Sequence, residues 1–571
     1  MVFKLNNSLL FTAKRVINLN SKRLSSDATT RPATIKRLRL SKTQIAFGLA
    51  TSVGIIEYNT NDTFHAFVRH VGLTTKRSGI VAQATVRCFY DYRKTLNNKY
   101  ETQEEYYNAL DACHLRCALI TLDALRQNGG IYIKLGQHIS AMTYLLPPQW
   151  TDTMIPLQDH CPKSTIEEID NMFKHDLKMG IDEIFSEFNP EPIGVASLAQ
   201  VHTATLNDTN DRVAVKCQHP SLKEFIPLDI MLTQLVFNLL DVFFPEYPLT
   251  WLGDELQTSI YVEINFEKEA KNAIDTQNYF AKYKKQTALR IPNVISAHKR
   301  ILIMEYITGR RLDDLQYLDE NNISRAEVSS CLSHIFNNMI FTPNVGIHCD
   351  PHGGNLAIRA CKYGSSSNPH NFEIILYDHG LYRHPTTEMR RDYAKFWLAL
   401  FDQDQDKMKF YAKRFAHIND KQFPLFAAAI TGRSIDTALN YDISSSRSKN
   451  EIDVMSKGIL KGNFLTNLMS ILATIPRIVL LILKTNDLTR HLDECLQNPL
   501  GPERTFLIMT QYCSKTVYDE DCEEINKLNI RWSWSWTLSH ILAWLNYEKR
   551  VKKLVLYDIA LWWKQNIMTM L

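Results

Sequence analysis

The stretch that decides the fold is His348-Cys349-Asp350-Pro351-His352-Gly353-Gly354-Asn355, together with Tyr377-Asp378-His379-Gly380. It places an Asp, an Asn five residues later, and a second Asp just before a Gly. Enzymes that transfer or hydrolyse phosphate use this order, in which the first Asp orients the attacking group. We therefore predict that Asp350 is catalytic and that Asn355 and Asp378 bind Mg²⁺, which prefers hard oxygen ligands. The alternative is a polar turn between two strands, because Asp, Gly, Asn and Pro all favour turns.

The residues around this stretch favour the catalytic interpretation. Residues 337–347 have the pattern of a helix end that enters a loop. Residues 356–358 and 374–377 have the pattern of two short apolar strands, and Asp378 directly follows the second. This arrangement is typical of the floor of a kinase active site.

A second group of motifs lies upstream. Val213-Ala214-Val215-Lys216 is predicted to be a strand, paired with a strand over 201–206, and it matches the kinase strand whose lysine holds the α- and β-phosphates. A lysine at a strand end is usually just solvated, so it needs an acidic partner to be informative. Glu263 and Glu269 follow on a predicted helical run over 251–280, and Glu305 falls where kinases join their lobes and contact adenine.

The glycine-rich loop of ordinary kinases is missing. The chain has Gly194-Val195-Ala196-Ser197-Leu198-Ala199-Gln200-Val201-His202 where G-x-G-x-x-G would stand. An alanine loop cannot bring its backbone amides as close to phosphates, because each Cβ takes room and positive φ is disfavoured.

Together these motifs resemble the UbiB family of atypical protein-kinase-like proteins, also called aarF-domain-containing kinases. The resemblance covers roughly residues 110–420. Residues 378–382 and 477–487 are similar to the mitochondrial inner-membrane branch linked to coenzyme Q and lipid homeostasis, and the chain resembles a fungal member of it. The matching motifs are Lys134-Leu135-Gly136-Gln137, Ser197 to His202, Val213 to Lys216, Glu263 to Glu269, His348 to Asn355, and Asp378-His379-Gly380.

The resemblance implies an α+β, bilobal protein-kinase-like fold with a helical N-terminal extension that carries the K-x-G-Q motif and a helical C-terminal extension. The expected divisions are a presequence (1–26), a candidate transmembrane anchor (43–60), the helical extension (61–165), the N-lobe (166–305), the C-lobe (306–425) and the C-terminal extension (426–571).

The resemblance also assigns roles to individual residues. ATP or ADP with Mg²⁺ is the expected cofactor, held by Lys216 paired with Glu269 and contacted by Ala196, Ser197 and Glu305. Lys134 and Gln137 should project into the cleft where a kinase binds its protein substrate, with Glu263 pairing to Lys134.

Three residues depart from the family pattern. Asn265 replaces an Asp in the E-x-D motif, so we expect the contact made by Lys134 to lose one negative charge. Gly353 replaces a Pro in the catalytic loop, which reduces local rigidity. Gly194 and Val195 replace two alanines before the alanine-rich loop.

The N-terminus has the composition of a mitochondrial transit peptide. Residues 1–26 contain five Lys or Arg and no acid, and the alternative is a disordered basic tail. Residues 45–56 are apolar but short for a membrane span, so a buried or interfacial helix is the alternative to an anchor. Cations precede this segment and none directly follows, which places the bulk of the protein in the intermembrane space.

The rest of the chain narrows the class of protein. A net charge of +4 over 571 residues gives no reason to expect nucleic acid as a partner. Residues 469–483 are apolar and are better interpreted as a core helix than as a membrane span, because Pro476 and Arg477 interrupt them. Six of the nine tryptophans lie in the last forty residues beside Lys and Arg, which predicts either a membrane interface or a helical hairpin packed on the C-lobe.

We therefore expect an ATPase or a kinase of small molecules or lipids at the mitochondrial inner membrane, acting on a lipid or a quinone. The alternative is a lipid-binding or transport module that ATP binding switches without productive turnover. A pseudokinase scaffold is a third interpretation, against which the intact Lys216, Asp350, Asn355 and Asp378 argue. The sequence identifies no protein partner.

Overall fold

The computed structural model describes residues 62–142, 146–157, 163–245, 249–349, 353–361, 368–431, 471, 474–498, 501–528 and 531–570. The predicted presequence, the predicted anchor at 43–60 and Asp350 lie outside these residues. The chain divides into two compact units, 1–73 and 74–571. In the first unit the described residues form the start of helix α3 (Asp62–Leu96), and the remaining description concerns the second.

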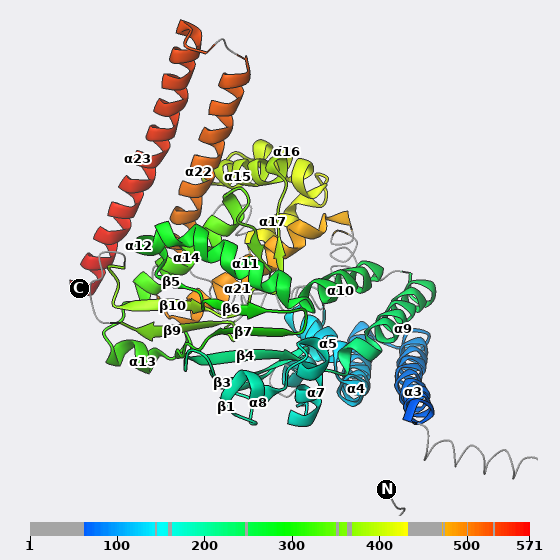
Figure 1. Ribbon diagram of the computed structural model, residues 1–571. Coiled ribbons are helices and arrows are strands. Elements are labelled where there is room, and N and C mark those ends of the chain that lie inside the picture. The colour runs from blue at the N-terminus through cyan, green and yellow to red at the C-terminus, as the bar shows by residue number, and fades with distance from the viewer. Residues whose placement is uncertain are drawn as a thin grey trace, which may run out of the picture. The chain divides into compact units, whose positions relative to one another are not determined.

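A six-stranded antiparallel sheet forms the smaller lobe. Its strands run in the order β1-β3-β4-β7-β6, and β2 also pairs with β3, at Gln200 and Val201, whereas β1 pairs with the other end of that strand (Figure 1). The strands are β1 (Phe185–Phe188), β2 (Gly194–Val195), β3 (Ala199–Leu206), β4 (Arg212–Gln218), β6 (Val294–Ala297) and β7 (Ile301–Glu305).

Strand β4 divides its side chains between the two faces of this sheet, as period-two alternation requires. Val213, Val215 and Cys217 belong to the apolar cluster that includes α7 (Ile166–Asp176), with α8 (Ile181–Ile184) beside it. Ala214 packs in a separate cluster with α11 (Phe266–Phe280), so Lys216, two residues on, emerges on the α11 face.

The larger lobe carries two small sheets on a helical body. β5 (Leu289–Arg290) is parallel to β10 (Phe372–Leu376), which pairs antiparallel with β9 (Leu356–Ala360). β8 (Ile347–His348) pairs with β11 (Tyr382–Arg383). The flanking helices are η2 (Ala281–Tyr283), α12 (Lys284–Thr287), α13 (Leu315–Glu320), α14 (Arg325–Phe341), α15 (Thr387–Phe401), α16 (Gln405–Ala416) and α17 (Phe423–Thr431). This architecture confirms the predicted α+β, two-lobed fold.

The N-terminal extension is helical, as predicted. Gly129 (φ 64°) and Gly130 (φ 57°) separate two of its helices by adopting positive φ, which side chains with a Cβ disfavour. Its elements are α3, α4 (Gln103–Asn128), α5 (Ile131–Ala141), α6 (Pro148–Met154) and η1 (Ile155–Leu157), and α9 (Leu222–Phe243) and α10 (Thr250–Glu263) pack with them. By length and composition, α9 is the one described helix that could cross a membrane, a test that core helices also pass.

The C-terminal extension contains α21 (Arg477–Cys495), α22 (Gly501–Leu528) and α23 (Trp534–Met570). Val479 and Ile482 of α21 are fully buried, so residues 477–483 of the segment predicted as a core helix are confirmed as one. α22 packs on α14 and α15, and α23 runs back beside α22 as the second arm of a hairpin (Figure 1).

The predicted continuous helix over 251–280 is wrong. α10 ends at Glu263 and α11 begins at Phe266, because Asn265 has extended backbone angles and its side chain accepts hydrogen bonds from the backbone N–H groups of Glu267 and Lys268. This is N-capping, which starts a new helix. Glu263 and Glu269 therefore lie on two different helices.

Candidate functional site

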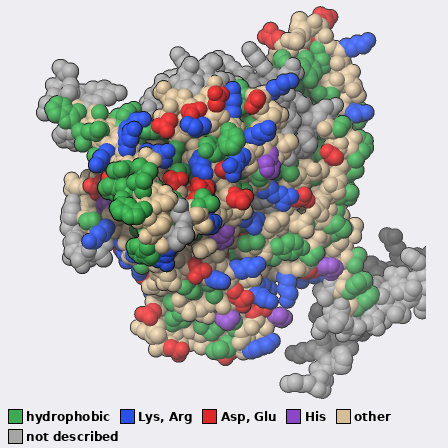
Figure 2. Space-filling model, turned by 90° about the horizontal axis from the view of Figure 1, so that it is seen from above, with side chains coloured by type: hydrophobic (Ala, Val, Ile, Leu, Met, Phe, Trp, Pro, Cys, Tyr) green, Lys and Arg blue, Asp and Glu red, His purple; other side chains and the backbone are tan. Residues whose placement is uncertain are grey.

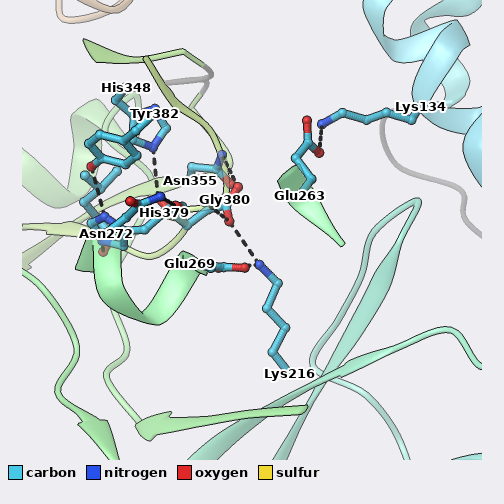
Figure 3. Close-up of polar contacts among 12 residues, drawn as sticks. Lys134, Lys216, Glu263, Glu269, Asn272, His348, Asn355, His379, Gly380 and Tyr382 are labelled. Carbon is cyan, nitrogen blue, oxygen red and sulfur yellow. Dashed lines mark hydrogen bonds and ion pairs between the residues drawn. The ribbon is translucent and has the colours of Figure 1, made fainter. Parts of the chain in front are cut away.

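Lys216 joins the two lobes. Its ammonium lies 2.6 Å from Glu269 Oε1 on α11 and 3.0 Å from Asp378 Oδ1, which follows β10 (Figure 3). The ring of Phe266 lies 5.2 Å from the same ammonium. One cation thus bridges an acid of the smaller lobe and an acid of the larger lobe.

Asp378 is held by contacts on both its side chain and its backbone. Its carboxylate accepts hydrogen bonds from the Gly380 backbone N–H (3.3 Å) and from Asn355 Nδ2 (3.4 Å), and its carbonyl lies 2.9 Å from His348 Nε2. Burial disfavours the charged form, but the Lys216 ammonium, Glu269 and His348 together outweigh it and hold the pKa of Asp378 well below its usual range. Asp378 is therefore a permanent anion.

Glu269 behaves differently from its neighbour. Burial raises the pKa of Glu269 to about 8, although Lys216 favours its ionised form. Its second oxygen, Oε2, is buried without a hydrogen-bond partner among the described residues. Two carboxyl groups beside one ammonium leave one negative charge unbalanced, and a proton on Glu269 removes it. A divalent cation on Asp378 and Asn355 would balance the same charge, so these residues fit Mg²⁺.

The alanine-rich loop is a tight turn between β2 and β3. The backbone N–H of Ala196 donates to the carbonyl of Ala199 at 2.7 Å. Ser197 Oγ lies 3.4 Å from Gln137 Oε1, and Gln137 Nε2 donates to the Leu157 carbonyl at 3.1 Å. Gly194 lies in β2 without positive φ, and a Cβ there would meet nothing within 4 Å, so its replacement of an alanine does not change the loop.

Two residues that the sequence analysis left without a role hold this loop from behind. His219 Nε2 lies 3.0 Å from the Ala196 carbonyl, and its Nδ1 lies 2.8 Å from Ser164 Oγ. Gln200 spans the backbone of Ser164, accepting from its N–H at 2.8 Å and donating to its carbonyl at 3.1 Å. Gln200 was visible as part of the S-x-x-Q-V-H motif, whereas no sequence signal marked His219.

The expected contact between Lys134 and Glu263 forms. Lys134 Nζ on α5 lies 2.8 Å from Glu263 Oε2 at the end of α10, and both side chains are only 12% exposed (Figure 3). Glu263 Cγ is also 3.8 Å from the position of a Cβ built on Gly380, so the pair lies beside the Asp378 segment. Asn265 takes no part in an added charge contact, because its side chain oxygen caps α11. Asn and Asp are equally good N-caps, so the departure from the family pattern has a structural explanation.

Helix α21 supports the catalytic loop. Thr485 Oγ1 donates to the His348 carbonyl at 3.3 Å, and the side chain of Leu492 lies 3.9 Å from the position of a Cβ on Gly353. That spacing is ordinary van der Waals contact, so space alone does not require glycine at 353. Thr485 belongs to the distal motif that the sequence analysis had quoted without a role.

Two candidate site residues, Glu305 and Asp350, remain. The Glu305 carboxylate is held by Arg290 at 2.6 and 2.8 Å and by the Asn293 backbone N–H at 3.1 Å, so its side chain is already engaged. Asp350 lies outside the described residues, between Cys349 and Gly353. The described site therefore contains Lys216, Glu269, Asn355 and Asp378 in contact, with Gln137 and Ser197 at the adjoining loop.

The chain is similar in sequence to known proteins. The family model of the ABC1 atypical kinase-like domain matches residues 156–412. The ABC1 family protein MCP2 of Saccharomyces cerevisiae is 68% identical over 533 residues, covering 93% of this chain and 94% of that protein. AarF domain-containing protein kinase 1 of Xenopus laevis is 33% identical over 489 residues, covering 85% of this chain and 89% of that protein. Among solved structures, the complex of Rv3197 with erythromycin from Mycobacterium tuberculosis aligns with 60% of this chain and 89% of that one, at 17% identity and a TM-score of 0.37.

Proposed function

Because the chain belongs to the ABC1 family of atypical kinase-like proteins, we propose that it binds Mg-ATP between its lobes and hydrolyses it or transfers its phosphate to a small molecule or lipid. The contact of Lys216 with both Glu269 and Asp378 carries this proposal. A lysine held by an acid at the lobe interface is the arrangement that positions nucleotide phosphates.

Each residue of the site has one task in this function. Lys216 binds the phosphates, and Glu269 keeps its ammonium in place. Asn355 and Asp378 would hold Mg²⁺, which neutralises phosphate charge when bound. Asp350 orients the attacking hydroxyl or water, and the turn at Ala196 and Ser197 covers the nucleotide.

Helix α5 makes protein substrates the less favoured acceptors. Gln137 reaches the alanine-rich loop, and Lys134 is paired to Glu263 next to Gly380. A helix tied at both points occupies the approach that an extended peptide would need, whereas a small molecule or a lipid head group needs less room.

Thermal shift with Mg-ATP tests the nucleotide site. Wild type and Asp519→Asn, which changes an exposed acid of α22, should be stabilised by several degrees at saturating Mg-ATP, because a ligand that binds only the folded state stabilises it. Asp378→Asn should lose most of that shift. Equal stabilisation of Asp378→Asn and wild type would refute the assignment.

A second candidate function is a switch that nucleotide binding operates without chemistry. It is favoured by the contact between Lys216 and Asp378, which already joins the two lobes in this structure. Phosphates that take over the ammonium would release this contact between the lobes, so nucleotide binding alone could switch the conformation of a lipid-binding module. If Asp350→Asn still binds nucleotide and restores growth to cells that lack the protein, the conformational switch is favoured. If Asp350→Asn binds nucleotide but does not restore growth, phosphate chemistry is required.

We place the protein at the mitochondrial inner membrane, facing the intermembrane space, in coenzyme Q and lipid homeostasis. The basic, acid-free residues 1–26 and the apolar residues 45–56 support this location. Residues 1–60 fused to a reporter should reach mitochondria, and the full chain should resist carbonate extraction. A cytosolic reporter contradicts the compartment, and carbonate extraction contradicts the anchor alone.

The C-terminal hairpin supports contact with a membrane surface. Trp532 and Trp534 are 76% and 91% exposed, and exposed apolar side chains continue along α23 at helical spacing. Figure 2 shows hydrophobic side chains gathered near Lys and Arg over the hairpin. Trp beside cations suits the boundary between lipid and water, so Trp534→Ser should weaken sedimentation with anionic phospholipid vesicles. Unchanged sedimentation would contradict this contact.

A further inference from the structure

An apolar cavity of about 270 Å³ lies between the N-terminal extension and the α9–α10 segment, apart from the nucleotide-site residues. Its walls come from α3, α4, α5 and α9, and from the first turns of α6 and α10 with the residues just before them. The α3 wall extends from Val81 to Leu96, which corresponds to about 22 Å of helix. The volume lies just below the ~300–1,000 Å³ typical of ligand sites, and because it extends over this length the space is narrow.

The polar side chains along most of this cavity are already satisfied by one another. Trp150 Nε1 donates to Tyr92 Oη at 2.9 Å, and Tyr92 Oη lies 2.7 Å from His114 Nδ1. Thr233 Oγ1 donates to the Asp229 carbonyl at 2.7 Å. Burial lowers the pKa of His114 to about 4, so its ring is neutral at physiological pH. A cavity lined this way holds water poorly and takes apolar ligands.

Two unsatisfied polar atoms lie in residues that line the cavity. Tyr132 Oη and Asn128 Oδ1 are buried without hydrogen-bond partners in the described part of the chain. The nearby charges neutralise each other, because Arg77 pairs with Asp229 and also donates to the Asn128 carbonyl. The described residues of the wall therefore carry two neutral polar atoms without a partner, and they hold no free charge that would pair with an ionised group.

Helix α5 connects this cavity to the nucleotide site. Tyr132, Leu135 and Ile139 line the cavity and share one face of the helix. Lys134 and Gln137 lie on the opposite face, where they contact Glu263 and Ser197. A ligand that moves α5 by a fraction of an ångström must therefore move both contacts.

We propose that this cavity binds a single apolar chain with one neutral polar end, such as a long-chain alcohol, and that the bound chain changes nucleotide affinity through α5. The coupling rests on the proposed nucleotide site, whereas the binding of the chain does not.

The binding is tested on the full chain with the neutral fluorophore N-phenyl-1-naphthylamine, without nucleotide. Ala84 lines the cavity, and Ala82 is exposed two residues away on the same helix. Ala84→Trp should weaken saturable binding at least tenfold, while wild type and Ala82→Trp bind alike. Equal binding by Ala84→Trp and wild type overturns the proposal. Ala124→Phe, on the α4 wall, replaces Ala84→Trp if that variant does not fold.

The location and the chemistry of the ligand are tested separately. A diazirine-bearing hexadecanol should label α3 or α9 of wild type on irradiation, and label confined to α23 overturns the site. 1-Dodecanol should displace the fluorophore at several-fold lower concentration than dodecanoate, because a carboxylate would be buried without a partner. If dodecanol and dodecanoate displace the fluorophore at the same concentration, the claim that the ligand has a neutral polar end is overturned.

The coupling is tested by Mg-ATP affinity with and without 1-dodecanol. The Kd should change several-fold in wild type and Ala82→Trp and should stay constant in Ala84→Trp. A constant Kd in wild type overturns the coupling. Failure of wild type to bind Mg-ATP at all refutes the proposed function but leaves the fluorophore result standing.

Discussion

At the scale of single residues, Gly136 explains the glycine of the K-x-G-Q motif. A Cβ at this position would lie 2.1 Å from Leu157 Cδ1 and 3.2 Å from Leu125 Cδ1. The glycine therefore allows α5 to pack closely against η1, and this packing sets where Lys134 and Gln137 point. In this motif Lys134 and Gln137 supply the side chains that point towards the site, and Gly136 allows the close packing that orients them.

Gly136→Ala should lower the free energy of unfolding by about 1–3 kcal/mol, because the added methyl group overpacks a buried contact. The Mg-ATP thermal shift should fall with it as α5 moves. Gly79→Ala is the matched control: no atom lies within 4 Å of a Cβ there, and alanine favours a helix by about 0.5–1 kcal/mol. Urea denaturation of both variants measures these free energies of unfolding. If Gly136→Ala is as stable as wild type, the packing argument is contradicted.

Asn265 should act through its capping bond and not through charge. Asn265→Ala should cost about 1 kcal/mol of stability, whereas Asn265→Asp should leave stability nearly unchanged. Neither the Mg-ATP affinity of Asn265→Asp nor its Lys134 contact should differ from wild type. A marked gain in affinity would show that the position contributes charge to the site after all.

At the scale of elements, α21 supports the catalytic loop although it lies beyond residue 412, where the family match ends. Thr485 donates to the His348 carbonyl, Asn486 donates to Tyr393 Oη at 2.8 Å, and Asp493 accepts from Ser329 of α14. The helix thus connects the loop that holds Asn355 to the helical body of the larger lobe. The C-terminal extension is part of the site's structural support.

Asp493 gives this support a pH dependence. Burial raises its pKa to about 6, above the ~3.9 of an unfolded Asp. The folded state therefore binds the Asp493 proton more tightly than the unfolded state does. The stability that this proton contributes is fully present below pH ~4 and is lost as pH rises through about 6. Asp493→Asn stays neutral, so it should match wild type near pH 4 and be more stable by on the order of 2 kcal/mol at pH 7.5.

Melting temperatures across pH 4 to 7.5 measure this difference. The exposed substitution Asp519→Asn serves as the control and should follow wild type throughout. A constant difference between Asp493→Asn and wild type over the whole range would exclude titration of Asp493 as the cause.

At the scale of the whole second unit, two largely buried lysines connect its parts. Lys216 links the lobes, and Lys134 links the N-terminal extension to α10. The alanine-rich loop meets the extension at Gln137. The proposed nucleotide site therefore lies where three parts of the chain meet, and its residues also hold those parts together.

Lys216→Met should destabilise the protein by on the order of 3 kcal/mol without nucleotide, because it leaves Glu269 and Asp378 facing each other unpaired. Lys163→Met removes a lysine from the exposed pair with Glu191 and should change stability little. Chemical denaturation in the absence of Mg-ATP compares the two. Similar stability of both variants would mean that the bridge between the lobes adds nothing to the fold.

The sequence by itself determined the strands around Lys216 and Asp378 and the residue types of the site, because these depend on local periodicity and fixed spacing. β3 and β4 appear in the alternation around Val213, and Lys216, Asn355 and Asp378 stand at spacings that one chemistry requires. The α+β fold followed from these patterns and from the resemblance.

Only the tertiary structure decided which groups meet across long stretches of chain. It separated α10 from α11 by a single capping bond, engaged Glu305 with Arg290, and placed His219 behind the alanine-rich loop. The cavity is also invisible in the sequence, since its walls are ordinary apolar helix faces. Local patterns report how a residue relates to its near neighbours, whereas these contacts depend on how helices far apart in the chain pack together.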